Sequence, residues 1–243
     1  MKNFNYETAI NQLVLDKKRV LNTQIKYELI PKWTESKGFF ELFLPYLKII
    51  GDSREQDVWV KKACEHYGIA FETAKKDTAL GTENLKEGDY TFCVVFGNKT
   101  YNYLGDVAYE RKGSIAEFYG NCTKWNKEKK VSDRQRIKRE LNRFEEKQYR
   151  KVVLMLEFGE CITDTIDQTF EYRTPHGTEK KDTKNICYSA LMSWKQPNNN
   201  SFEILQSSNR KKLFWLFLQD CYYFFRNEIR NECISKHLIE KGE

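Results

Sequence analysis

The sequence predicts an α/β fold in which a central mixed β-sheet is flanked by helices. Three stretches carry this prediction: a strand followed by a helix over residues 47–68, successive strands joined by tight turns over 88–113, and a helix followed by a wholly apolar strand over 132–159. Strands joined by tight turns are antiparallel, whereas a short apolar strand suits a buried parallel position. The sheet is therefore expected to contain both kinds of pairing.

The chain begins with a stretch that is expected to form an N-terminal helical extension over residues 1–45. Charged and apolar residues mix there at roughly helical spacing, Leu13 and Val20 among them. The main domain is expected over residues 46–235, and a short tail over residues 236–243.

The main domain opens with "YLKIIGDSREQ", which reads as a buried strand that ends in a polar turn. The next segment, "DVWVKKACEHYGI", places Val60, Ala63 and Tyr67 on one side, as an amphipathic helix does. Gly68 is a typical helix terminator. A strand followed by a helix is thus expected here.

The stretch "GDYTFCVVFGNKTYNYLGDVAYERKG" predicts a meander of strands. Its β-branched and aromatic runs are separated by "GNK" and "GD", which are typical of tight turns. Asp106 stands in the second of these sequences and is expected to be a turn residue.

A further helix and strand are expected after this meander. Ile137, Leu141 and Phe144 fall on one helical stripe, and Ser132 is suited to be the N-cap of that helix. The apolar segment "VVLMLEFG" that follows is suited to a buried parallel strand.

The last part of the chain combines loops with a second apolar segment. Residues 173–185 and 196–201 are expected to be surface loops. Residues 210–232 are apolar on nearly all sides over their first half, so as a helix they should be deeply packed or take part in a subunit contact.

Composition narrows the class of protein. The chain has 243 residues, no run long and apolar enough to span a membrane, and no apolar core of a signal peptide at its start, so an intracellular, cytoplasmic protein is expected. Its seven cysteines form no CxxC pair and its histidines number three, which indicates reduced thiols and no structural zinc. The net charge of +6 fits an anionic partner.

The spacing of charged residues at the end of the meander indicates which carboxylates can act together. Glu110 and Lys112 share one face of a strand because they are two residues apart. Asp106 lies about 13 Å from Glu110 along an extended strand, at about 3.3 Å per residue, which is too far for one metal ion unless the strand bends at Gly105. Asp89, at the start of a neighbouring strand, is therefore the better partner.

The segments "DSREQ", "EGDY" and "ERKG", in this order, resemble the XPF-type nuclease domain, a branch of the PD-(D/E)XK nuclease superfamily. The likeness continues through "RIKRELNRF", "VVLMLEFG" and "CYSALMSW", which look like the helix, strand and helix of that family. It covers roughly residues 47–230 and implies a restriction-endonuclease-like core within the domain expected over 46–235.

The resemblance also implies a metal-dependent active site. Lys112 would position the attacking water, Arg111 would steady the site or a phosphate, and Glu117, one step beyond the usual spacing, has no assigned role. Mg²⁺ is the implied cofactor and Mn²⁺ is expected to replace it. The implied metal ligands are Asp52, Glu55, Asp89 and Glu110.

Basic residues after this site are candidates for DNA binding, with a solvated surface as the alternative interpretation. Trp125 could stack on an unpaired base, and basic side chains could hold phosphates. Arg54 is a further candidate, with a structural role as its alternative. The basic candidates after the site are Lys124, Lys127, Lys129, Lys130 and Arg136.

The expected function is that of a Mg²⁺-dependent DNA endonuclease that selects flaps, forks or other branched or partly single-stranded DNA. The chain after residue 230 is too short for the paired helix-hairpin-helix units of eukaryotic and archaeal members, so the compact versions of bacteriophage and mobile elements are the expected comparison. Repair, recombination or phage DNA processing in a bacterial or phage-infected cytosol is the expected setting, with a homodimer possible. Two alternatives stay open: a non-catalytic module that binds DNA or a protein, and a sequence-specific restriction-type endonuclease.

Overall fold

The computed structural model describes the greater part of the main domain. The described residues are 43–55, 58–74, 85, 87–96, 99–123, 125–126, 131–132, 142–160, 169–174, 177–182, 192 and 202–235. Most of the expected N-terminal extension, the tail over 236–243 and the helix expected around "CYSALMSW", apart from Met192, lie outside them.

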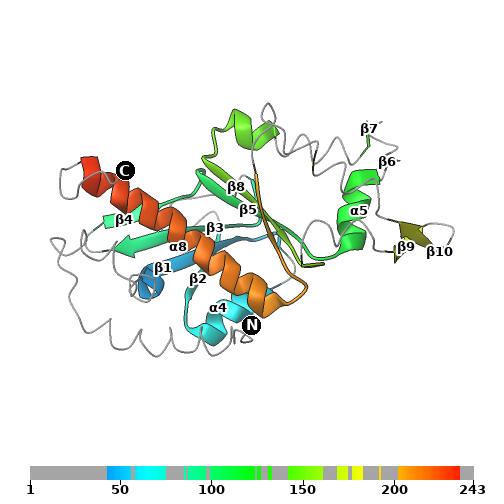
Figure 1. Cartoon of the computed structure of the whole chain (residues 1–243), viewed down its shortest axis with the longest axis horizontal. Helices are drawn as coiled ribbons and strands as arrows, with labels where there is room; N and C mark the ends of the chain where they lie inside the picture. The colour runs from blue at the N-terminus through cyan, green and yellow to red at the C-terminus, as the bar shows by residue number, and fades with distance from the viewer. Residues whose placement is uncertain are drawn as a thin grey trace. The chain divides into compact units, whose positions relative to one another are not determined.

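The predicted fold class is confirmed: the chain has an α/β fold with a central mixed sheet of seven strands, flanked by helices (Figure 1). The strand order is β11-β8-β5-β3-β1-β2, with β4 paired to β3. The strands of this sheet are β1 (Leu47–Asp52), β2 (Ala70–Ala74), β3 (Tyr90–Phe96), β4 (Lys99–Asn102), β5 (Val107–Lys112), β8 (Lys151–Leu156) and β11 (Glu203–Gln206). The main helices are α4 (Trp59–Tyr67), α5 (Ile115–Thr123) and α8 (Arg210–Ser235), and two short hairpins pair β6 (Trp125–Asn126) with β7 (Val131–Ser132) and β9 (Thr169–Thr174) with β10 (Gly177–Asp182).

The chain divides into two compact units. The first contains β1, α4, β2, β4 and most of β3 and α8, and the second contains β5, α5, β8 and β11. In the first unit, β1 and β2 are parallel and in register from Lys48 with Ala70 to Asp52 with Ala74. Helix α4 connects them and ends at Gly68, whose φ of 64° is the left-handed conformation that a helix C-cap favours. The strand and helix expected here are thus confirmed.

Aromatic side chains pack α8 into the core of the first unit. Phe225 stacks on Phe43 with a centroid distance of 5.4 Å, and Phe214 stacks on Tyr67 at 5.8 Å. Most apolar residues of α8 are buried, including Leu218, which is 0% exposed. The deep packing expected for this helix is confirmed, and its apolar composition serves the interior of the chain itself.

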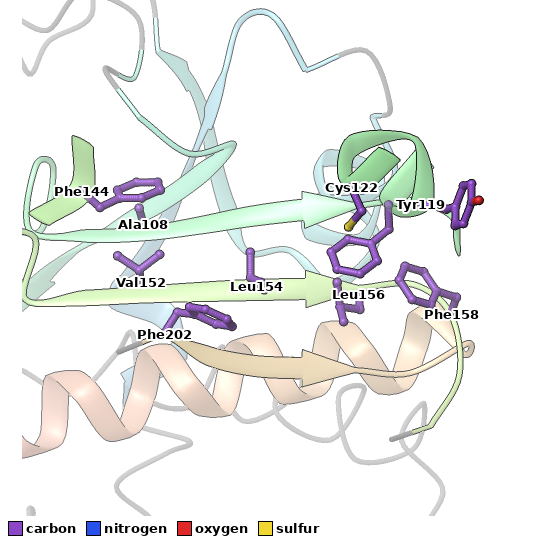
Figure 2. Close-up of a cluster of buried hydrophobic side chains, with 10 residues drawn as sticks. Ala108, Tyr119, Cys122, Phe144, Val152, Leu154, Leu156, Phe158 and Phe202 are labelled. Atoms are coloured by element: carbon purple, nitrogen blue, oxygen red, sulfur yellow. The ribbon is translucent and has the colours of Figure 1, made fainter. Parts of the chain in front are cut away.

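The core of the second unit lies on one face of β5, β8 and β11 (Figure 2). Strand β8 is parallel to both of its neighbours, as expected, and Leu154 and Leu156 alternate with residues on its other face. Aromatic rings from outside the strands complete this cluster, Phe118 of α5, Phe144 and Phe202 among them. These contacts hold β5 in place through Ala108.

Three details differ from the sequence-based expectations. Strand β5 does not pair with β4 in a meander, because Tyr109 of β5 pairs with Tyr90 of β3. Ser132 is not a helix N-cap and belongs to β7. The loop expected over residues 173–185 is largely the β9–β10 hairpin. A ladder bonds backbone groups, so a charged sequence such as "GTEKKD" can still form a strand.

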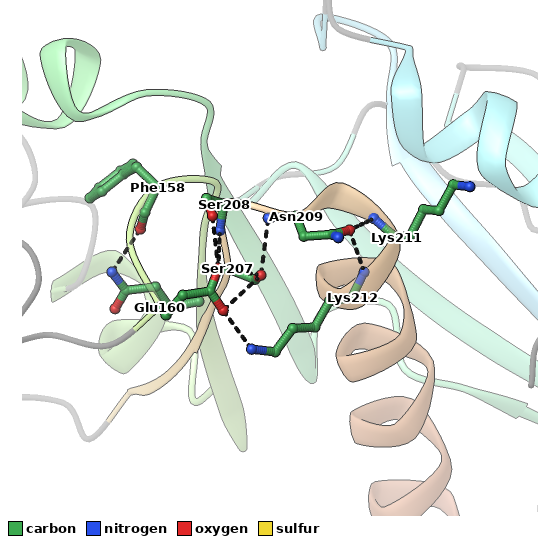
Figure 3. Close-up of polar contacts among 8 residues, drawn as sticks. Phe158, Glu160, Ser207, Ser208, Asn209, Lys211 and Lys212 are labelled. Atoms are coloured by element: carbon green, nitrogen blue, oxygen red, sulfur yellow. Dashed lines mark hydrogen bonds and ion pairs between the residues drawn. The ribbon is translucent and has the colours of Figure 1, made fainter. Parts of the chain in front are cut away.

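The first turn of α8 is capped by side chains of the residues just before the helix and of the segment after β8 (Figure 3). Asn209 accepts the N–H groups of Lys211 and Lys212 at 2.9 and 3.1 Å. Glu160 accepts hydrogen bonds from Lys212, from the hydroxyl and N–H of Ser208, and from the hydroxyl of Ser207. A carboxylate at this position stabilises the helix because it opposes the positive end of the helix dipole.

Replacement of a buried leucine tests the core of the second unit. Leu154→Ala should lower the free energy of unfolding by about 2–5 kcal/mol, because it removes apolar contacts and leaves a cavity. Denaturant unfolding followed by circular dichroism measures this change. Val95→Ala, at a side chain that is 44% exposed, is the control and should change stability by no more than about 0.5 kcal/mol. Equal losses for the two variants would contradict the proposed core.

The cap made by Glu160 predicts a pH dependence. Hydrogen bonds from Lys212 and Ser208 lower the pKa of Glu160 to about 2, with Ser207 adding to them and burial opposing them. A lowered folded-state pKa contributes stability above the unfolded pKa of about 4.3, and this contribution disappears as the pH falls through about 2. Glu160→Gln should therefore cost up to about 1 kcal/mol at pH 7, since the side chain is 44% exposed and solvent screens it. The difference from the wild type, measured by denaturant unfolding, should vanish near pH 2, and a difference independent of pH would exclude this origin.

Candidate active site on strands β3 and β5

The centre of the candidate site is an ion pair on one face of β5. Lys112 Nζ lies 2.6 Å from Glu110 Oε1, and the two side chains share this face because they are two residues apart. The Lys112 side chain is 5% exposed and that of Glu110 is 18% exposed. An ammonium group buried to this degree needs an opposite charge and hydrogen bonds, because removal from water is costly. Glu110 supplies both.

Asp89 lies beside Glu110 at the point where β3 begins. Its N–H donates to Tyr109 O at 2.8 Å, and its carboxylate Oδ2 accepts the N–H of Arg111 at 2.7 Å. Asp89 therefore bonds the residues on both sides of Glu110. The pairing of Tyr90 with Tyr109 places Asp89 opposite Glu110 on adjacent antiparallel strands, where side chains are neighbours. The structure thus brings Asp89, at the start of a neighbouring strand, beside Glu110 and Lys112, the two residues that spacing placed on one face.

The chain segment before Asp89 is held in place by a glycine and by a buried carboxylate. Gly88 has a φ of 80°, and a Cβ there would lie 3.0 Å from Ala108 Cβ. Glu87, whose side chain is 8% exposed, accepts two hydrogen bonds of 2.9 Å from Arg143 Nε and pairs with Lys147. This anchor was missed from the sequence, where an acid two residues before Asp89 in "KEGDY" was its only signal.

Carboxylates near this segment also raise the pKa of a tyrosine. Burial, together with the charges of Glu87 and Asp106, raises the pKa of Tyr149 to about 12. Asp106 is a turn residue, as expected: its carbonyl accepts the N–H groups of Arg150 and Lys151, and its carboxylate pairs with Arg150 at 2.9 Å. Asp106 therefore connects the start of β5 to the start of β8 through these contacts.

Arg111 projects to the other face of β5 from Glu110 and Lys112. Its guanidinium pairs with Glu157, whose second carboxylate oxygen accepts Arg210 Nε at 2.8 Å. The Glu157 side chain is 3% exposed and that of Arg111 is 9% exposed. Strand alternation explains this separation, since residue 111 points away from residues 110 and 112. The arginine expected to steady the site or a phosphate is engaged with a protein carboxylate.

Glu117 is part of a helix cap. Its N–H donates to Ser114 Oγ at 3.1 Å, and its carboxylate accepts the N–H of Gly113 at 2.8 Å. This is a variant of the capping box at the start of α5, in which the carboxylate reaches one residue further back. The cap explains the acidic residue that the sequence left without a role.

Asp52, Arg54 and Glu55 form a group in the first unit. Asp52 ends β1 with a side chain that is 3% exposed, and both of its carboxylate oxygens accept Arg54 guanidinium nitrogens at 2.8 Å. Glu55 N–H donates to Asp52 O at 3.3 Å, which closes the turn after the strand. Arg54 pairs with Asp52 in this way while its side chain is 67% exposed, and its expected contact with DNA stays a prediction. The expected coordination of a metal by Asp52 and Glu55 stays a prediction.

The basic segment proposed for DNA contact lies almost wholly outside the described residues. This applies to Lys124, Lys127, Lys129, Lys130 and Arg136, while Trp125 is described only as part of β6. Their expected contacts with DNA stay predictions.

Four cysteines of the described part of the chain belong to the core. Cys64, Cys93, Cys122 and Cys221 are buried and form no disulfide bond. Burial raises the pKa of Cys93, with Lys48 lowering and Glu72 raising it. A raised pKa disfavours the thiolate that a nucleophile requires. The chemistry of the site is therefore that of carboxylates and an amine.

Two carboxylates on adjacent strands fit a Mg²⁺ ion by their donor chemistry. Over the described residues, no group of three or more His, Cys, Asp or Glu side chains is placed to hold a metal. Mg²⁺ is commonly bound by one or two carboxylates, with waters and substrate phosphates as its other ligands. Asp89 and Glu110 are the residues in the second unit that would hold such an ion.

Comparison of the chain with models of protein families and with curated proteins finds a match to neither. Among the described helices, none combines the length and the apolar character that a membrane span needs.

Glycine substitutions test how Asp89 is placed. Gly88→Ala should lower the free energy of unfolding by about 1–3 kcal/mol more than Gly105→Ala does. The φ angles are 80° at Gly88 and 83° at Gly105, so both substitutions strain the backbone. A Cβ at Gly105, however, would have no neighbour within 4 Å. Thermal or denaturant unfolding measures the difference. Equal losses would show that the backbone conformation alone is responsible, without close contact to β5.

Proposed function

We propose that the chain is a metal-dependent endodeoxyribonuclease that hydrolyses phosphodiester bonds. The observation that carries the proposal is the placement of Asp89, Glu110 and Lys112 next to one another on two adjacent strands. The resemblance of "DSREQ", "EGDY" and "ERKG" to the XPF-type nuclease domain gives the reaction class. Mg²⁺ is the proposed cofactor, with Mn²⁺ as its substitute.

The carboxylates of Asp89 and Glu110 provide negative charge where a phosphodiester must approach. A divalent ion bound there would supply Lewis-acid activation of water and neutralise the phosphate charge. Asp89 is held in place for this role by its two hydrogen bonds to β5. A carboxylate that is fixed before substrate binds loses little entropy on binding.

Lys112 supplies a positive charge that does not depend on a cofactor. Its ammonium group is buried and oriented by Glu110, so it is already directed to this face of β5. A fixed cation in a site of low dielectric stabilises the negative charge that develops on the attacking oxygen and the phosphate. We assign Lys112 to this role. Arg111, on the other face, is assigned to holding the strand and not to the reacting phosphate.

DNA with branches, flaps or single-stranded segments is the proposed substrate, and the net charge of +6 supports an anionic partner. The assay for the proposal incubates the full chain with end-labelled flap, fork, duplex and single-stranded DNA in Mg²⁺ or Mn²⁺. Cleavage that EDTA abolishes supports the proposal, and discrete fragments from plain duplex would identify a sequence-specific restriction-type enzyme instead. Absence of cutting on all four substrates rejects the nuclease function.

Removal of the amine tests the role of Lys112. Lys112→Met keeps the length and most of the volume of the side chain and should lower kcat about 10²–10³-fold, as loss of one group that stabilises a transition-state oxyanion does. Lys151→Met is the matched control, because Lys151 also pairs with a glutamate, Glu203 at 2.9 Å, but at the opposite end of the parallel β5 and β8 strands. Its kcat should equal that of the wild type. An active Lys112→Met variant would remove lysine from the mechanism.

A second candidate function is a non-catalytic module that uses the same fold to bind DNA or a protein. One observation favours it: both carboxylate oxygens of Asp52 accept hydrogen bonds from Arg54. Calorimetric titration with Mn²⁺ separates the two functions. A site that is lost in Asp89→Asn and Glu110→Gln supports the enzyme, and DNA binding without any Mn²⁺ site supports the module.

A further inference from the structure

We propose that Glu157 is a positioning residue for the Glu110–Lys112 pair, acting through Arg111. The inference rests on the function proposed above and deepens it by naming a residue that does not share the face of the reacting groups. It follows from three sets of contacts around the end of β5.

The first set joins Glu157 to the end of the site strand. Glu157 directly follows β8, and its N–H donates to Lys112 O at 3.1 Å. Its carboxylate pairs with the guanidinium of Arg111, the residue between Glu110 and Lys112. One side chain and its backbone therefore contact two consecutive residues of "ERK".

The second set restricts the guanidinium itself. The Arg111 side chain is 9% exposed, and a Cβ added to Gly113 would lie 2.7 Å from Arg111 Nη2 and 3.3 Å from its Cζ. The guanidinium thus lies against the backbone of Gly113, in space that another residue would fill. On the other side, the N–H of Arg111 is held by Asp89 Oδ2. Backbone and side chain of Arg111 are each fixed by a different carboxylate.

The third set shows why the charge of Glu157 matters. Glu157 is 3% exposed and also accepts Arg210, the first residue of α8, so one carboxylate compensates two guanidinium groups. Without that charge, the buried guanidinium of Arg111 is left beside a second cation. A buried unpaired charge moves toward water when it can. The movement available to Arg111 carries with it the strand segment that holds Glu110 and Lys112.

The test compares Glu157→Gln with Glu160→Gln in the full chain. Both glutamates follow β8 and accept a cation of the first turn of α8, and Glu157 in addition contacts Lys112 and Arg111 of β5. Glu157→Gln should lower kcat about 10–100-fold with KM for DNA unchanged, the range typical of residues that orient a site from behind. It should also speed amide hydrogen exchange at Arg111, whose N–H reports on the bond to Asp89. Glu160→Gln should keep both values within about twofold of the wild type.

A merely structural role is separated by two further variants, each measured on protein shown to be folded by circular dichroism. Glu157→Asp keeps the charge and should recover part of kcat. This variant also provides the test if Glu157→Gln fails to fold. In an Arg111→Gln background, Glu157→Gln should reduce kcat by no more than about twofold, because residues that act as a unit are not additive.

The outcomes distinguish this inference from the proposed function. An active wild type whose kcat and Arg111 exchange are unchanged in the Glu157 variants overturns the inference alone. Faster exchange with unchanged kcat assigns Glu157 to stability and overturns it as well. Independent, multiplicative losses in Arg111→Gln and Glu157→Gln overturn action through Arg111. A wild type that cuts none of the four DNA substrates removes the proposed function and this inference together.

Discussion

The structure around the candidate site depends on the cost of burying an amine. Lys112 is almost fully enclosed, and its ammonium group is tolerated there because Glu110 lies 2.6 Å away on the same face of β5. That requirement fixes the rotamers of both side chains and the direction in which this face of the strand presents charge. A β5 strand shifted by one residue would bury the wrong side chains on both faces, since alternation has a period of two. The parallel register with β8, from Val107 with Lys151 to Lys112 with Leu156, prevents that shift.

Two carboxylate side chains that are buried in the second unit, those of Glu87 and Glu157, are each matched by two cations. Glu87 holds Arg143 and Lys147, and Glu157 holds Arg111 and Arg210. The Glu87 pairs lie just before the start of β3, and the Glu157 pairs lie on the face of β5 opposite to Glu110. The carboxylate of Asp89 accepts the backbone N–H of Arg111 at 2.7 Å, so it is tied to the strand that carries Glu110.

Much of the fold followed from the sequence because local patterns and tertiary packing agree. The helix α4 ends at Gly68 as its sequence predicts, and β8 is apolar on both faces because it lies between two parallel neighbours. The errors arose where backbone pairing decides the structure and side chains do not. Ser132 has the chemistry of an N-cap, yet its segment pairs with Trp125 in β6 and β7. Likewise, nothing in "YNYLGDVAYERKG" states that Tyr109 pairs with Tyr90 of β3.

For the site, spacing predicted that Glu110 and Lys112 share a face, which their ion pair confirms, and the glycine turn before β3 predicted the place of Asp89 beside β5. Spacing could not reveal the partners of Arg111 and Glu117, because Glu157 lies 46 residues from Arg111 and the cap of α5 depends on the path of the chain after β5. Within "ERK", the two faces of β5 have different contacts. Alternation sends Glu110 and Lys112 to the face where Asp89 stands and sends Arg111 to the face where Glu157 stands. An "ERK" sequence on a strand can therefore place a glutamate–lysine pair on one face of the strand and an anchoring arginine on the other, provided that the opposite face offers a buried carboxylate.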